Sequence, residues 1–141
     1  MRIRLLAPSL IFLLCSGAVW ADPTGMLVIK VTPRVVEPDQ SVSWEQPMSQ
    51  VTAPGTPVVV KIDADPLKIR VTVTPFVRGK DLLLVVQGDV TQVSPSGVSR
   101  STTLQSLHIP PGEDVVYFPL GRSADSERRM VVLLRVDFQD E

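Results

Sequence analysis

Apolar and polar residues alternate one by one along much of the chain. In residues 68–74 every second side chain is apolar, and this spacing puts the apolar set on one face of an extended strand. Residues 82–86 are apolar throughout, which is typical of a strand buried on both faces. Turn-forming residues, with Gly79 among them, occupy residues 75–80 between the two segments. Residues 67–91 therefore predict a β-hairpin, which we take as the centre of the fold.

The same pattern predicts further strands on both sides of this hairpin. No segment repeats its apolar residues every 3.6 positions, and prolines recur along the chain, so long helices are not expected. About eight short strands joined by turns predict an all-β fold, an antiparallel β-sandwich of immunoglobulin-like architecture. The expected strands outside the hairpin cover residues 26–32, 41–45, 57–63, 103–109, 113–120 and 130–138.

Proline, glycine and serine mark the expected interruptions of this pattern. Pro33 is expected to end the first strand, and the long strand after the turn is expected to bulge at Gly88. Residues 94–101 are mostly Ser, Pro and Gly and predict a mobile loop. Residues 121–129 predict a second loop, which is rich in charge.

The N-terminus has the layout of a secretory signal peptide. Basic residues lie within residues 2–4, a mostly apolar run follows, and Ala21 supplies the small residue before a cleavage site. Residues 1–21 are therefore predicted to be removed, with cleavage after Ala21. The alternative is a retained membrane anchor. An anchor needs about 20 apolar residues, whereas Pro8 and Gly17 interrupt this run.

A lipid anchor at Cys15 is a third interpretation of this segment. Bacterial lipoprotein sites have small residues just before the cysteine, whereas Leu13 and Leu14 stand here, so a lipoprotein is not expected. Cys15 is the single cysteine, and the mature chain would contain none. It would then fold without disulfides and have no thiol nucleophile or thiolate metal site.

The mature chain, residues 22–141, is predicted to be a single β-sandwich domain of the periplasm or the extracellular space. Loss of Arg2 and Arg4 would lower the basic residues from 14 to 12 against 15 acidic ones, which leaves a net charge of −3. Nucleic acid binding needs a concentrated basic face, so nucleic acid is not an expected partner. Contact with the membrane is expected only through the signal peptide.

No group of residues has the pattern of a catalytic, cofactor or metal site. His108 is the only histidine, and a partly covered structural role is expected for it. Asp63 and Asp65 could approach a calcium ion, but the rest of a calcium-binding loop is missing, so solvated turn residues are expected. No nucleophile-elbow or phosphate-binding glycine pattern occurs. We therefore predict a protein that is not an enzyme and has no catalytic residue, cofactor or metal.

Two further features are considered as binding sites. Arg135 and Asp137 lie two apart on one strand face, where they form either a recognition patch or, as we expect, a solvated face paired with Lys or Glu across the strand. Trp44 and the few other aromatic residues could form a platform for a sugar, although packing in the core or its rim is expected.

Between residues 69 and 138 the order of short motifs resembles the β-strands of outer-membrane secretin channels. The residues that carry this resemblance are Val73-Thr74-Pro75, the segment 112–116 with its Val115-Val116 pair, and the apolar segment 130–136. The chain is too small to form such a channel alone. No functional residue is carried over from that family.

These features predict an exported, non-catalytic module that binds another envelope or secreted protein. Its expected contact surfaces are an exposed sheet edge, which can accept a strand from a partner, and the loops 94–101 and 121–129. Residues 26–32 are the expected pairing strand. Two alternatives stay open: a structural subunit of an envelope appendage assembled by strand addition, and a small hydrolase or carbohydrate-binding domain. The sequence leaves the oligomeric state open.

Overall fold

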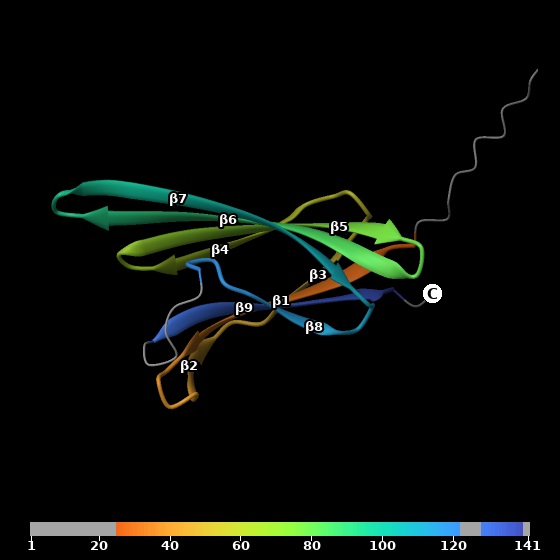
Figure 1. The fold of residues 1–141 in the computed structure, drawn as a ribbon, viewed down its shortest axis with the longest axis horizontal. Coiled ribbons are helices and arrows are strands. Elements are labelled where there is room, and N and C mark those ends of the chain that lie inside the picture. The colour runs from red at the N-terminus through yellow and green to blue at the C-terminus, as the bar shows by residue number, and fades with distance from the viewer. Residues whose placement is uncertain (1–24, 122–127, 140–141) are drawn as a thin grey trace, which may run out of the picture.

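The structure, a computed structural model, describes residues 25–121 and 128–139. Within them the chain forms nine β-strands in two antiparallel sheets that pack against each other (Figure 1). The predicted all-β fold of packed antiparallel sheets is confirmed. The signal peptide predicted at residues 1–21, with Cys15, lies outside the described residues, as does most of the predicted loop 121–129. No helix in the described part of the chain is long and apolar enough to cross a membrane.

Sheet A contains five strands arranged around β1. β9 pairs with one side of β1 along its whole length, and β8 pairs with the far side of β9. The other side of β1 pairs with β3 through its first half and with β2 through its last residues. The bounds are β1 Leu27–Val36, β2 Val42–Glu45, β3 Met48–Thr52, β8 Asp114–Tyr117 and β9 Arg129–Phe138.

Sheet B is a meander of four strands in chain order. The pairing of β5 with β6 confirms the hairpin predicted at residues 67–91, although its turn contains only Gly79 and Lys80. β6 and β7 extend past the other strands at one end of the molecule, on the left in Figure 1. The bounds are β4 Val58–Ala64, β5 Leu67–Arg78, β6 Asp81–Ser94 and β7 Gly97–Ile109.

The core lies between the two sheets and takes every second residue of the inner strands. Each fully buried aliphatic side chain contributes about 1.5–3 kcal/mol relative to leaving it exposed. Pairing across ten positions of β1 and β9 fixes which residues of sheet A face inward. The largest fully buried side chains include Tyr117, Leu27, Ile29, Leu82, Leu84 and Leu134.

Two prolines lie inside strands. Each proline lacks the backbone N–H that would point to a neighbouring strand, but at both positions no described strand is paired on that side. Pro33 lies in β1, and its carbonyl accepts a hydrogen bond from the Gln46 amide (3.1 Å), between β2 and β3. Pro75 lies in β5, and its carbonyl accepts from the Gly55 amide (2.7 Å), before β4 begins. Neither proline removes a ladder hydrogen bond. The prediction that the first strand ends at Pro33 is therefore wrong.

β6 is buried on one face and only partly covered on the other, so the prediction of burial on both faces is wrong. Leu82 and Leu84 point into the core, whereas Leu83 and Val85 are half-buried on the outer face. The register with β5 and β7 continues unbroken through Gly88, so the bulge expected there is also wrong. The alternation follows from a sheet with one covered face.

Residues 94–101 form the closed end of a hairpin and not the expected mobile loop. The turn consists of Pro95 and Ser96 alone, and Ser94 pairs with Gly97. The Ser94 hydroxyl donates to the Gly97 carbonyl at 3.1 Å, which closes the turn. Small polar residues were thus a sign of an exposed strand as much as of a loop.

β1 is an internal strand, so the expectation that residues 26–32 form the pairing edge is wrong. Residues 27–31 pair with β3 on one side and with β9 on the other. Both rows of backbone hydrogen-bonding groups are therefore used within the sheet. An added strand would have to displace β3 or β9.

Candidate functional site

β7 is an edge strand of sheet B, and it is the longest edge strand in the described part of the chain. Its 13 residues pair with β6 on one side, and no described strand pairs with its other side. The other edge strands have seven residues (β4), five (β3) and four (β2 and β8). Native proteins usually keep sheet edges short or blocked. A long open edge is therefore a candidate surface for pairing with another chain.

Every second residue of β7 turns its backbone N–H and C=O toward this open side. The Val93 amide of β6 donates to the Pro66 carbonyl at 3.2 Å, so Val93 faces β5 and is not bonded to its β7 partner, Val98. The alternation of an antiparallel ladder extends this assignment along β7. The residues with outward-facing backbone groups are Val98, Arg100, Thr102, Leu104, Ser106 and His108.

The same residues carry their side chains on the outer face of sheet B, the face turned away from sheet A. Leu104 is 67% exposed and Val98 is 61% exposed, the largest fractions among the exposed large hydrophobic side chains. Arg100 is the one β7 residue with a formal charge when histidine is neutral. β7 has neither proline nor lysine, which commonly protect an edge. The edge is thus open, partly apolar and weakly charged.

Tyr117 holds the middle of β6 and β7 against sheet A. Its side chain is 1% exposed, and its hydroxyl hydrogen-bonds with the Thr103 hydroxyl of β7. A Cβ at Gly88 of β6 would lie 3.2 Å from Tyr117 Cζ and still closer to the Tyr117 hydroxyl. Glycine is therefore required at this close approach. The buried Tyr117 side chain thus holds β6 and the open-edged strand β7 in position against sheet A.

A hollow of about 590 Å³ lies on the outer face of sheet B beside the open edge. All four strands of the sheet contribute to it, and β7 supplies Arg100, Ser101 and Thr102. It is lined by four basic and two acidic side chains, although acidic residues outnumber basic ones in the chain. The charged residues are Lys61, Lys68, Arg70, Arg100, Asp63 and Asp89.

The charges in this hollow are not neutralised by ion pairs. Lys61 lies directly opposite Arg70 on β5, and like charges in that arrangement destabilise a sheet. Two oppositely charged pairs also face each other across the strands, Lys68 with Asp63 and Arg70 with Asp89, although neither is within ion-pair distance. None of the four basic side chains forms an ion pair with another described residue. The Asp89 carboxylate accepts a hydrogen bond from Thr102 (2.8 Å). The hollow therefore keeps an excess of positive charge beside β7.

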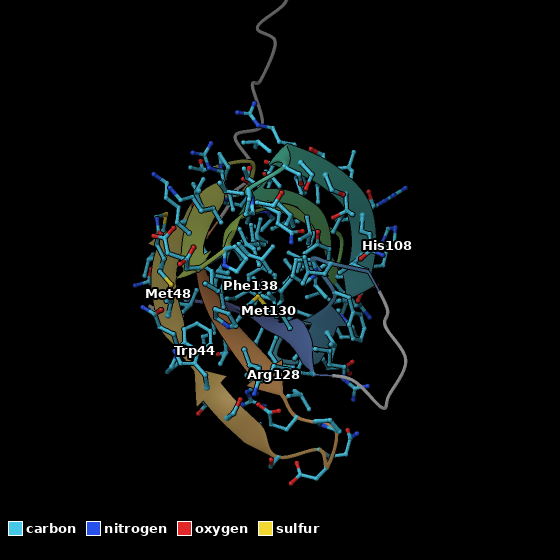
Figure 2. All side chains as sticks on the ribbon, turned by 90° about the vertical axis from the view of Figure 1, so that its left-hand side faces the viewer. Trp44, Met48, His108, Arg128, Met130 and Phe138 are labelled. Carbon is cyan, nitrogen blue, oxygen red and sulfur yellow. The ribbon has the colours of Figure 1, made fainter. Side chains whose placement is uncertain are left out.

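The residues that the sequence suggested as candidates lie far apart. His108 is exposed on the outer face of sheet B, so the expectation of a partly covered position is wrong. Trp44, which is 40% exposed on β2, lies with Met48 at the opposite side of the molecule (Figure 2). Among the described residues, no three His, Cys, Asp or Glu side chains gather as a metal site would require. Trp44 and His108 cannot belong to one site.

Arg135 and Asp137 lie on the outer face of sheet A, where they bind each other. Arg135 Nε is 3.2 Å from Asp137 Oδ2, and Arg135 Nη1 is 4.0 Å from Asp114 Oδ1 of β8. These partners differ from the expected ones, which were Lys or Glu residues across the strand. Asp63 lies in β4, where it lines the hollow, and Asp65 lies in the turn that follows.

A separate ionic cluster lies at the end of β1. Arg128 Nε is 2.9 Å from Glu37 Oε1. A hydrogen bond from Ser43, and then this guanidinium, hold the pKa of Glu37 below its usual value. The Ser41 hydroxyl and amide donate to Asp39 and lower the pKa of that carboxyl. The cluster joins the β1–β2 turn to the start of β9, which is a structural role.

Comparison of the chain with family models, with curated proteins and with solved structures found no match. No function is therefore transferred from a relative, and the resemblance to secretin channels remains one of short motifs. The functional hypothesis rests on the geometry of β7 and of the hollow beside it.

Sequence reasoning missed both the β7 edge and the hollow. The absence of proline from residues 97–109, directly after a two-residue turn, was the available signal for a long strand. The basic residues Lys61, Arg70 and Arg100 come from three strands. Only the pairing of β4, β5, β6 and β7 brings them together, and a single sequence does not reveal that pairing.

Proposed function

We propose that this protein is an exported, non-catalytic binding or assembly module of the periplasm or cell surface. It accepts an extended strand of a partner along the open side of β7, so that sheet B gains a strand. The observation that supports this most directly is the row of outward-facing amides and carbonyls from Val98 to His108. We further propose that its two-layer architecture is of the immunoglobulin-like type.

The energetics of the edge are favourable for strand addition. Each backbone hydrogen bond contributes about 0.5–1.5 kcal/mol net, and the 13 residues of β7 allow several such bonds. Leu104 and Val98 add apolar area that a partner would cover. Ordering of the incoming segment opposes these gains, so the expected complex is specific but of moderate affinity.

A carbohydrate-binding role is the second candidate. Trp44 lines a hollow of about 400 Å³ with Arg34 and Glu45, and a partly exposed indole beside polar groups suits a sugar ring. Arg34 Nε is already 2.8 Å from Glu45 Oε2, so these two polar groups bind each other. Strand addition at β7 is therefore the better supported function.

Site-specific photo-crosslinking in the native cells tests the proposal. A photoreactive residue replaces Leu104 on β7 or, as the control position, Lys80 in the β5–β6 turn. We expect a crosslinked product with a second polypeptide at position 104 and none at position 80. The mass of the product identifies the partner.

A proline on the open side separates strand addition from other contacts. Thr102→Pro removes an outward-facing N–H in the middle of β7, and the ladder to β6 is kept. Thr102→Val is the matched control, because both variants lose the bond to Asp89 but only proline loses the N–H. We expect the crosslink to disappear in Thr102→Pro and to persist in Thr102→Val. Equal crosslinking in the two variants would contradict the proposal.

A further inference from the structure

We infer that the strand added along β7 is β4 of a second copy of this chain, in the register that sets Arg100 opposite Asp63. This inference rests on the proposed function and names its partner. β4 and β7 are the two opposite edges of sheet B. In one antiparallel register they extend the sheet from one copy into the next.

β4 offers a matching open edge. The Pro75 carbonyl of β5 accepts from the Gly55 amide, so alternate residues of β5, including Val73, face β4. Val73 is paired with Val58, and the next residue of β4, Val59, therefore turns its backbone groups away from β5. The residues of β4 with outward-facing backbone groups are Val59, Lys61 and Asp63.

The register is set by charge and apolar contact together. With Arg100 opposite Asp63, Leu104 lies opposite Val59, because each pair is four residues from the other on both strands. Leu104 is 67% exposed and Val59 is 46% exposed in the single chain, so the contact covers two apolar side chains. Outward-facing backbone groups stand opposite each other in all of these pairs, as an antiparallel ladder requires.

Arg100 lies opposite Thr91 within its own chain and gains an acidic partner in this arrangement. Side chains directly opposite on neighbouring strands have Cβ atoms about 4.5–5.5 Å apart, which is close enough for Arg100 to bind the Asp63 carboxylate. Lys61 of the second copy falls opposite Thr102, next in the row to Asp89. Arg70 already has Asp89 opposite it within the chain, so the residue that gains a nearby carboxylate is Lys61.

The alternatives on β7 itself are less suitable. β7 has no acidic residue, so β7 of a second copy has nothing to bind Arg100.

The two edges of sheet A also have exposed apolar residues, with Val116 on β8 and Met48 on β3. Short connections place β8 at the β7 side and β3 at the β4 side. The contact is head-to-tail, and such contacts generate open filaments or closed rings.

Charge reversal tests the inference on the mature chain. Sedimentation or light scattering over a range of concentrations measures assembly of the unaltered protein, Arg100→Glu, Asp63→Arg and the double variant. We expect each single reversal to weaken assembly at least about tenfold and the double variant to restore it to within about threefold. Arg78→Glu, on the same face away from the hollow, is the control and should assemble normally.

Cysteine crosslinking tests the register, because the predicted mature chain has no cysteine of its own. Val59→Cys and Leu104→Cys proteins are mixed and oxidised. We expect a dimer in the mixture but in neither protein alone, and none when Val98→Cys replaces Leu104→Cys. Failure of the double reversal to restore assembly, or crosslinking in the wrong pair, would overturn the inference.

The outcomes separate this inference from the proposed function. A chain that stays monomeric at all concentrations, yet still gives a Thr102→Pro-sensitive crosslink to another polypeptide, overturns the second copy as partner and keeps strand addition. A chain that assembles equally well as Thr102→Pro and Thr102→Val overturns strand addition itself. Assembly that Thr102→Pro abolishes and that the charge swap restores supports both.

Discussion

β1 and β7 are both long strands, of 10 and 13 residues, but they occupy opposite positions in their sheets. β1 is paired on both sides and places Leu27, Ile29 and Val31 in the core at 1% exposure or less. β7 is paired on one side only, and Ile109 is its one fully buried residue.

β1 and β7 show two uses of a strand. In β1 apolar burial fixes the register, because a slip by one residue would turn the core residues toward solvent. In β7 the outward-facing groups contribute little to folding of the single chain, and their hydrogen-bonding capacity is left for a partner. A segment with few apolar residues can therefore be a strand that serves as a contact surface, and it need not be a loop.

The largest expected effect is on β1. Ile29→Ala removes a side chain that is 1% exposed, and we expect the free energy of unfolding to fall by about 2–5 kcal/mol. Leu104→Ala on β7, measured on protein dilute enough to be monomeric, should change it by no more than about 0.5 kcal/mol. Urea denaturation of both variants measures the difference. Similar losses at the two positions would mean that β7 is part of the folding core.

The next largest loss of stability is expected at Gly88, where β6 packs against Tyr117. Gly88→Ala places a Cβ against the Tyr117 ring and 3.0 Å from Thr103 Oγ1, and we expect a loss of about 1–3 kcal/mol from overpacking. Gly25→Ala is the control, because its Cβ would meet nothing within 4 Å. Thermal unfolding compares the two. A Gly88→Ala protein as stable as the control would show that Tyr117 does not pack over β6.

The alternation of apolar residues was sufficient to predict most strands, because it reports directly which face of a strand is buried. The ends of strands were less predictable. Pro33 and Pro75 were expected to interrupt strands, but whether a proline costs a hydrogen bond depends on what lies beside it in the sheet. Beside both prolines the neighbouring strand is interrupted, so no ladder hydrogen bond is lost. Where that strand is interrupted depends on residues distant in sequence.

The candidate site was less predictable than the fold. Arg100 and Asp63 lie on β7 and β4 with two strands between them, and neither residue has an unusual local pattern. β3 was missed, although its pairing with β1 is what makes β1 internal. The sequence therefore predicted an exposed edge for strand addition but placed it at residues 26–32.

The smallest expected effect is the pH dependence of stability that arises from Glu37 at the end of β1. Because the pKa of Glu37 is lowered from its ordinary 4.5, the charged carboxylate contributes stability that is present above that value and is lost as the pH falls through the lowered pKa. β7 has no carboxyl group, so it has no matching acid-dependent contribution of its own. An NMR titration should place the midpoint of Glu37 below 4.5. Ser43→Ala and Arg128→Gln should each raise this midpoint, since both side chains lower the pKa of Glu37. A midpoint at the ordinary value in the unaltered protein would show that the cluster does not hold the β1–β2 turn in solution.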